Sequence, residues 1–211
     1  MGKAFRGAFN DTDAPVLGGH AIRHAVARAG IEGGEVDDVL LGAAAQQGTQ
    51  GYNIARLSAM AAGLPNTVSG ASLDRMCSSG LMTIGYAAKA IMTNEIDIAV
   101  AGGLESISLT QNKHKNSYRN VSQAVLDHAP HMYMPMIETA EIVAERYNIS
   151  RDAQDEFAYQ SQMRTAAAQN AGKFDDEIVP FASVKAVFNK ETKETTYEDV
   201  TLAKDEGNRP S

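Results

Sequence analysis

The sequence predicts an α/β fold in which a mostly parallel sheet presents a cysteine at the turn between a strand and a helix. Two observations lead to this class. Short apolar runs alternate with helical patterns along the first 108 residues, and strands that alternate with helices in this way are typical of parallel sheets with right-handed crossovers. In addition, the single cysteine of the chain, Cys77, lies between one predicted strand and the helix that follows it.

The first predicted helix covers residues 15–29. Pro15 lies in its first turn and Gly30 follows its last residue, as is typical of helix boundaries. The positions that recur at helical spacing, and that we expect to face the core, are Gly18, Ile22, Ala25, Val26 and Ala29.

Two histidines, His20 and His24, lie four residues apart on this helix, a spacing that could hold a metal ion. Arg23 and Arg28 share their face, however, and no carboxylate or cysteine follows at ligand spacing. We therefore expect a solvated helix face and no metal site.

The remaining elements of the first 108 residues are three strands and two helices. The strands are predicted over 36–42, 67–73 and 96–102, and the helices over 53–62 and 78–92. The first two strands read as buried, because one has Val39-Leu40-Leu41 at its centre and the other mixes β-branched with small residues. Helix 78–92 carries no charge before Lys89, which predicts that protein layers cover it on both sides.

The composition changes after Ser108. A polar loop is predicted over 110–120, an irregular segment over 123–136, helices over 138–147 and 150–170, a polar hairpin from 184–188 and 195–201, and a charged tail over 205–211. Ser150 is the expected N-cap of the second helix, and Gly172 is expected to end it.

Composition and motifs exclude several functional classes. The net charge is −7, from 26 acidic and 19 basic residues with no long basic cluster, so nucleic acid is not an expected partner. No apolar run is long enough for a membrane span and no signal peptide is recognisable, which predicts a cytoplasmic or organelle-matrix protein that is not secreted. Neither a Gly-x-Gly-x-x-Gly nor a Walker sequence follows any predicted strand, so a nicotinamide or nucleotide-hydrolysing function has little support.

The position of Cys77 is that of a nucleophile. The open N–H groups and the positive dipole end of the following helix would stabilise a thiolate at this turn. A lone cysteine is more often an inert small hydrophobic residue, but the sequence around Cys77 argues against that interpretation.

Two motifs carry a family resemblance. They are Arg75-Met76-Cys77-Ser78-Ser79-Gly80-Leu81 and Ala101-Gly102-Gly103-Leu104-Glu105-Ser106-Ile107-Ser108. Together they resemble the thiolases, acyl-CoA acyltransferases that make or break a carbon–carbon bond next to a thioester. The resemblance implies a five-layered α-β-α-β-α fold and an acyl-enzyme thioester on Cys77. It further implies CoA and acyl-CoA as substrates rather than a bound cofactor, and a homodimer or homotetramer at full length.

The resemblance also divides the chain into three regions. Residues 1–108 are expected to be the N-terminal thiolase core with its first strand missing, and residues 109–177 the loop domain that covers CoA. Residues 178–211 are expected to be the return strand, the hairpin and a tail, without the C-terminal half of the family. No metal is implied.

The stretch from Tyr133 to Glu141 resembles the start of the covering helix in the loop domain. The resemblance therefore implies that Met134 and Met136 contact the pantetheine arm of CoA. Biosynthetic thiolases carry a His-Met pair where this chain has Pro135-Met136, and this departure favours the degradative branch, which acts in fatty acid β-oxidation.

Thiolases take their base from a second cysteine and their activating histidine from a Gly-His-Pro segment. Neither occurs in these 211 residues, so the chain is expected to be an incomplete, inactive portion that presents a reactive thiol. Three alternatives stay open: a ketosynthase-like condensing enzyme, a Cys-His hydrolase, and a non-catalytic interaction fragment. Labelling of Cys77 by acetyl-CoA would separate a thiolase from a ketosynthase, which takes its acyl group from a carrier protein.

Overall fold

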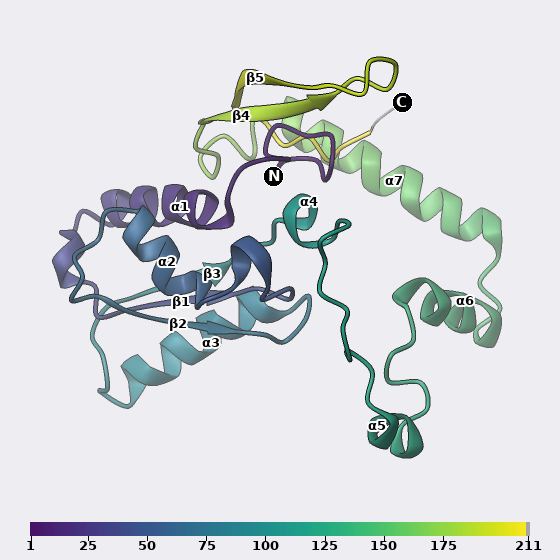
Figure 1. The fold of residues 1–211 in the computed structure, drawn as a ribbon, viewed down its shortest axis with the longest axis horizontal. Coiled ribbons are helices and arrows are strands. Elements are labelled where there is room, and N and C mark those ends of the chain that lie inside the picture. Colours follow the sequence, from purple (N-terminus) through teal and green to yellow (C-terminus); the bar gives the residue numbers. More distant parts are fainter. Residues whose placement is uncertain (210–211) are drawn as a thin grey trace. The chain divides into compact units, whose positions relative to one another are not determined.

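The computed structural model describes residues 1–209, which form two compact units (Figure 1). The first unit consists of Met1–Lys115 and Ile178–Gly207, and the second of Asn116–Glu177 with Asn208 and Arg209. The assignment of residues 109–177 to a CoA-covering loop domain stays a prediction. Pro210 and Ser211, the end of the predicted charged tail, lie outside the described residues.

A three-stranded parallel sheet forms the centre of the first unit. Its strands are β1 (Asp38–Gly42), β2 (Ser69–Leu73) and β3 (Ala99–Gly103), in the order β2-β1-β3. The helices α1 (Ala14–Ala29) and α2 (Ile54–Ala61) cover one face, and α3 (Ser79–Met92) covers the other (Figure 1). The predicted alternation of strands and helices is confirmed, although the strands begin two or three residues later than predicted.

The main core lies between this sheet and the α1–α2 layer. Val39 is 0% exposed and Leu41 5% exposed on β1, the central strand, as the sequence predicts. Just before the N-terminal end of β1, the Asp37 carboxylate accepts the backbone N–H groups of Ile98 and Asp97 at 3.0 and 2.8 Å. These two hydrogen bonds hold the pKa of Asp37 below its ordinary value.

The prediction that residues 67–73 form a buried strand is wrong. Three of the five residues of β2 are only partly buried and two are exposed. The physical reason is the strand order: β2 pairs with β1 alone and lies at an edge of the sheet in residues 1–209.

Helix α3 is covered on one face only. Ser79, Thr83 and Ala87 recur every four residues and are buried against the sheet. Leu81 and Met92, by contrast, are 74% and 81% exposed. The sequence predicts protein layers on both sides of α3. Within the described residues only one face of the helix is covered, because residues 1–209 place a single sheet against it.

The structure corrects two expectations about α1. Ala25 and Ala29 are exposed, because the helix packs through the set Ala14, Gly18, Gly19, Ile22 and Val26. His20 does not lie on a solvated face. Its ring stacks on Phe181 with a centroid distance of 4.3 Å, and its burial, only partly opposed by a hydrogen bond with the Val179 backbone, lowers the pKa of His20.

The second unit is helical and has few internal contacts. Its helices are α5 (Gln123–His128), α6 (Met136–Arg146) and α7 (Arg151–Asn170). The predicted irregular segment 123–136 thus contains a short helix, which the absence of a clean period conceals. Ser150 caps α7 as predicted, because its hydroxyl accepts the N–H of Ala153 at 3.2 Å.

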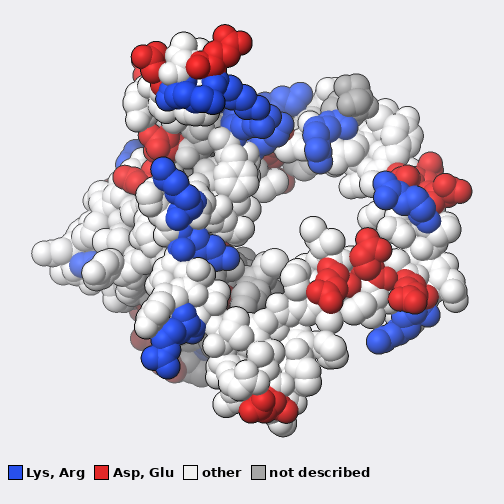
Figure 2. All heavy atoms as spheres, turned by 45° about the vertical axis from the view of Figure 1, so that its right-hand side comes forward, with Lys and Arg blue, Asp and Glu red and all other residues white. Residues whose placement is uncertain are grey.

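An antiparallel hairpin, β4 (Phe181–Phe188) and β5 (Thr195–Leu202), returns to the first unit. Figure 2 shows basic and acidic side chains intermixed at the top of the view, over this hairpin, as predicted for a polar surface element. Asn10 fixes β4 by donating to the carbonyl of Ala186 at 2.7 Å and accepting its N–H at 2.9 Å. The start of the tail is also held, since Glu206 accepts the N–H groups of Lys3 and Ala8.

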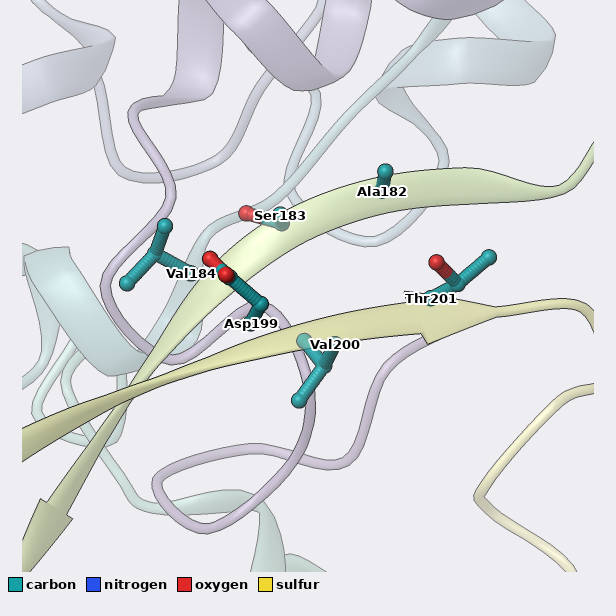
Figure 3. A pocket seen from close by; sticks show the side chains of 6 residues that line it. All are labelled: Ala182, Ser183, Val184, Asp199, Val200 and Thr201. Carbon is teal, nitrogen blue, oxygen red and sulfur yellow. The ribbon is translucent and has the colours of Figure 1, made fainter.

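A pocket lies on the hairpin itself (Figure 3). Its lining consists of Ala182, Ser183, Val184, Asp199, Val200 and Thr201. Asp199 is the one ionisable side chain in this set, and no cysteine or histidine belongs to it, so we do not consider the pocket a catalytic site. No helix within residues 1–209 has the length and apolar character needed to cross a membrane.

Candidate active site

Cys77 lies where the sequence predicts it, at the turn that joins β2 to α3, and its side chain is exposed. The residue before it, Met76, has a φ of 50°. This left-handed conformation costs a residue with a side chain about 1 kcal/mol or more. A strained residue next to a candidate nucleophile needs contacts that hold it in place.

Hydrogen bonds from three side chains hold this turn. Oδ1 of Asp74 accepts the N–H of Met76 at 2.7 Å. The hydroxyl of Ser79 accepts the N–H of Arg75 at 2.8 Å and donates to the carbonyl of Met76 at 2.6 Å. The hydroxyl of Ser78 donates to the carbonyl of Arg75 at 2.8 Å. We name residues 74–79 the nucleophile turn.

Glycines let the start of α3 lie directly on the sheet. A Cβ atom on Gly42, the last residue of β1, would lie 2.3 Å from the carbonyl carbon of Ser79 and 2.6 Å from the nitrogen of Gly80. A Cβ on Gly103, the last residue of β3, would lie 2.9 Å from Cα of Gly80. These close approaches place the nucleophile turn at the carboxyl edge of the sheet, where open α/β sheets bind their ligands.

A second polar cluster joins the loops that leave β1 and β3 at the same edge. Gln50 is fully buried, and its amide donates to Glu105 at 2.7 Å and to Ala45 at 2.9 Å, while its oxygen accepts the N–H of Ser106. Glu105 also accepts the N–H of Ala44 at 2.8 Å. Glu105 has no predicted role within its motif, and Gln50 was not predicted at all, because a glutamine in a segment that connects a strand to a helix carries no pattern of its own.

The arrangement around Cys77 places an exposed thiol beside the N-terminal end of a 14-residue helix. Among the described residues no histidine side chain forms a hydrogen bond with Cys77. No group of three or more His, Cys, Asp or Glu side chains that could hold a metal occurs in residues 1–209. The described residues around this turn therefore offer covalent chemistry at the exposed sulfur of Cys77.

The two predicted CoA-contacting residues lie in the second unit. Met136 is the first residue of α6 and is 74% exposed. Met134 is half-buried, and its N–H donates to the carbonyl of His131 at 3.1 Å. Pro135 between them occupies the N-cap position of α6, which fixes where the helix begins. Their assignment to CoA binding stays a prediction.

Comparisons with known proteins agree on one family. The family model described as "Thiolase, N-terminal domain" matches residues 1–210. The chain is 39% identical over 210 residues to the 3-ketoacyl-CoA thiolase of Bacillus subtilis (strain 168), covering 100% of this chain and 53% of that protein. It is also 39% identical over 187 residues to the acetyl-CoA acetyltransferase of Rhizobium meliloti (strain 1021), covering 84% and 47%.

A solved structure gives the same result. The crystal structure of the Bacillus anthracis acetyl-CoA acetyltransferase matches with a TM-score of 0.76 and 34% sequence identity, over 98% of this chain and 52% of that chain. The chain thus spans about half the length of the relatives it matches.

Proposed function

The chain belongs to the thiolase family, whose N-terminal domain it matches over residues 1–210, and from this premise we propose that Cys77 is the nucleophile of an acyl-CoA acyltransferase. The observation that carries the proposal is the exposed thiol at the N-terminal end of α3, on a turn held by side-chain hydrogen bonds. A helix N-terminus favours the thiolate, which is the nucleophilic form of cysteine.

In the thiolytic direction the Cys77 thiolate attacks the keto carbonyl of a 3-ketoacyl-CoA. The bond between C2 and C3 breaks, the acyl group forms a thioester with Cys77, and the enolate of acetyl-CoA takes a proton from an acid. A second CoA then gives its thiol proton to a base and attacks the thioester, which releases acyl-CoA and the Cys77 thiolate. The Claisen condensation is the reverse.

We propose that Met134 and Met136 contact the pantetheine arm of CoA. Methionine suits a surface that must fit a flexible ligand, because its side chain is unbranched and polarizable. The exposure of Met136 leaves its side chain available to a ligand. Pro135 before Met136 favours the degradative direction, although relatives of equal identity are named 3-ketoacyl-CoA thiolase and acetyl-CoA acetyltransferase.

The first prediction concerns the reactivity of Cys77. In the 211-residue chain, iodoacetamide should alkylate Cys77 faster than it alkylates glutathione at pH 7, because the thiol is exposed and lies beside the open N–H groups at the N-terminal end of α3, which stabilise negative charge on the attacking sulfur. Cys77 is the one thiol in the sequence, so peptide mapping assigns the adduct to this site, and the Cys77→Ser variant corrects for alkylation elsewhere. A rate at or below that of glutathione would contradict the nucleophile assignment.

The same 211-residue chain tests whether Cys77 accepts an acyl group from acetyl-CoA. After incubation with acetyl-CoA, the peptide that contains Cys77 should carry one acetyl group, removable by hydroxylamine as expected for a thioester. The Cys77→Ser variant is the control for labelling elsewhere. Labelling that depends on an acyl carrier protein rather than on acetyl-CoA would point to a ketosynthase-like enzyme instead.

The second prediction concerns self-association, which we propose to occur through β2. This strand lies at the edge of the described sheet, and unpaired strand edges are templates for pairing with another chain. The amide of Asn53 already occupies the carbonyl of Gly70, so only part of the edge is open. The exposed apolar face of α3 adds surface that soluble monomers rarely expose. Light scattering at tens of micromolar should show a dimer or larger species, and a clean monomer would contradict the proposal.

A further inference from the structure

Three side chains, those of Asp74, Ser78 and Ser79, make four hydrogen bonds to the backbone of the nucleophile turn. We propose that Asp74 and Ser79 are positioning residues, which hold Met76 in its left-handed conformation and thereby keep Cys77 at the first turn of α3. The proposal rests on the nucleophile role of Cys77 and deepens it, because it names the groups that hold the thiol in its reactive place.

Ser79 connects the two sides of the turn. Its hydroxyl accepts from the N–H of Arg75 and donates to the carbonyl of Met76, which uses both its donor and one of its acceptor sites. The side chain is 3% exposed, and a Cβ on Gly42 would lie 2.6 Å from its Cβ. Burial against Gly42 therefore keeps Ser79 beside the turn. Its two hydrogen bonds connect Arg75 and Met76, which precede Cys77, to the start of α3, which follows it.

Asp74 holds the turn from the N-terminal side of Cys77. Its carboxylate accepts the N–H of Met76 at 2.7 Å, the local pattern by which aspartate stabilises a turn two residues ahead. Because the left-handed conformation of Met76 is unfavourable for a residue with a Cβ, the turn should relax when either side chain is lost. Relaxation would move Cys77 away from the open N–H groups at the N-terminal end of α3, which stabilise negative charge on the attacking sulfur.

The variants Ser79→Ala and Asp74→Ala test the proposal in the 211-residue chain. Thr83→Val is the matched control for Ser79. Thr83 lies one turn further along the same face of α3, is fully buried, and donates to the carbonyls of Gly80 and Gly102 at 2.7 Å. Its loss should lower stability without releasing the turn. Asp74→Asn is the control for Asp74, since the amide oxygen still accepts the N–H.

Two readouts are measured on each variant. Hydrogen exchange should become at least tenfold faster at the Arg75 N–H in Ser79→Ala and at the Met76 N–H in Asp74→Ala, and stay unchanged at both in Thr83→Val. Alkylation of Cys77 should slow three- to tenfold in the two alanine variants and should recover in Asp74→Asn. Asp74 is exposed, so its variants test the proposal even if Ser79→Ala fails to fold.

Equal alkylation rates in Ser79→Ala, Asp74→Ala, Thr83→Val and the wild type would overturn the positioning role, whatever the exchange rates. The same conclusion follows if Thr83→Val slows alkylation as much as Ser79→Ala does, because loss of stability alone would then explain the effect. These outcomes leave the nucleophile assignment intact. A wild-type thiol no faster than glutathione would instead contradict that assignment.

Discussion

Replacement of Cys77 by alanine is expected to abolish thiolysis of acetoacetyl-CoA in a full-length enzyme, obtained by joining this chain to the C-terminal half of a thiolase relative. The substitution removes the sulfur on which the acyl group is carried, so no covalent route remains. A polypeptide of the 211 residues alone is also expected to show no turnover. Its one cysteine is the proposed nucleophile, and the 211 residues contain neither a second cysteine to act as the base nor a Gly-His-Pro segment with the activating histidine.

Met136→Ala provides the comparison in the same enzyme. Loss of one apolar contact with the pantetheine arm should cost about 1–3 kcal/mol. The effect should appear mainly in KM if the contact is equally strong in the ground state and the transition state. The two variants thus separate the covalent step from substrate binding, because Cys77→Ala should affect kcat and Met136→Ala should not.

Steady-state kinetics of the unmodified chain, the joined enzyme and the two variants measure these differences. Substantial turnover by the 211-residue chain, or by the Cys77→Ala enzyme, would mean that the chemistry lies elsewhere. Stability of the variants is checked by thermal unfolding. A chain that is acylated by acetyl-CoA without turning over fits the proposal, whereas a chain that is never acylated favours the non-catalytic interaction fragment.

The parts of the fold that could be predicted are those with a local signal. Alternating strands and helices, the N-cap at Ser150 and the turn at Cys77 each follow from residues that are neighbours in the sequence. The burial of β2 and of α3 could not be predicted this way. Whether an apolar strand is central or at an edge depends on strand order, and the same small and β-branched residues suit both positions.

The candidate site shows the same division. Cys77 could be found because it is unique and lies in a specific motif. Gln50 could not be found in this way. Its role comes from hydrogen bonds with Glu105 and Ser106, which are about 55 residues further along the chain. His20 was misassigned for the same reason, since its partner Phe181 is far from it in the sequence. Met134 and Met136 rest on resemblance alone, and their role stays a prediction.

Gly42→Ala is expected to destabilise the first unit and to slow alkylation of Cys77. The added Cβ would lie 2.3 Å from the carbonyl carbon of Ser79 and 2.6 Å from the nitrogen of Gly80. Both are backbone atoms at the start of α3, so no flexible side chain can make room for the methyl group. The helix must shift away from β1, and overpacking of this kind costs about 1–3 kcal/mol, occasionally more. Native domains are stable by only about 5–15 kcal/mol, so the loss is large.

Gly102→Ala is the matched control, because it makes the same change on β3 at a position where a Cβ meets no atom within 4 Å. It should be neutral or stabilising, since alanine loses less conformational freedom than glycine on folding. Urea unfolding of the 211-residue chain measures the difference in the free energy of unfolding, and iodoacetamide measures the thiol. If Gly42→Ala and Gly102→Ala unfold at the same urea concentration, the start of α3 does not depend on its contact with β1. If Gly42→Ala is destabilised but Cys77 reacts as before, the contact supports the fold without setting the position of the nucleophile turn.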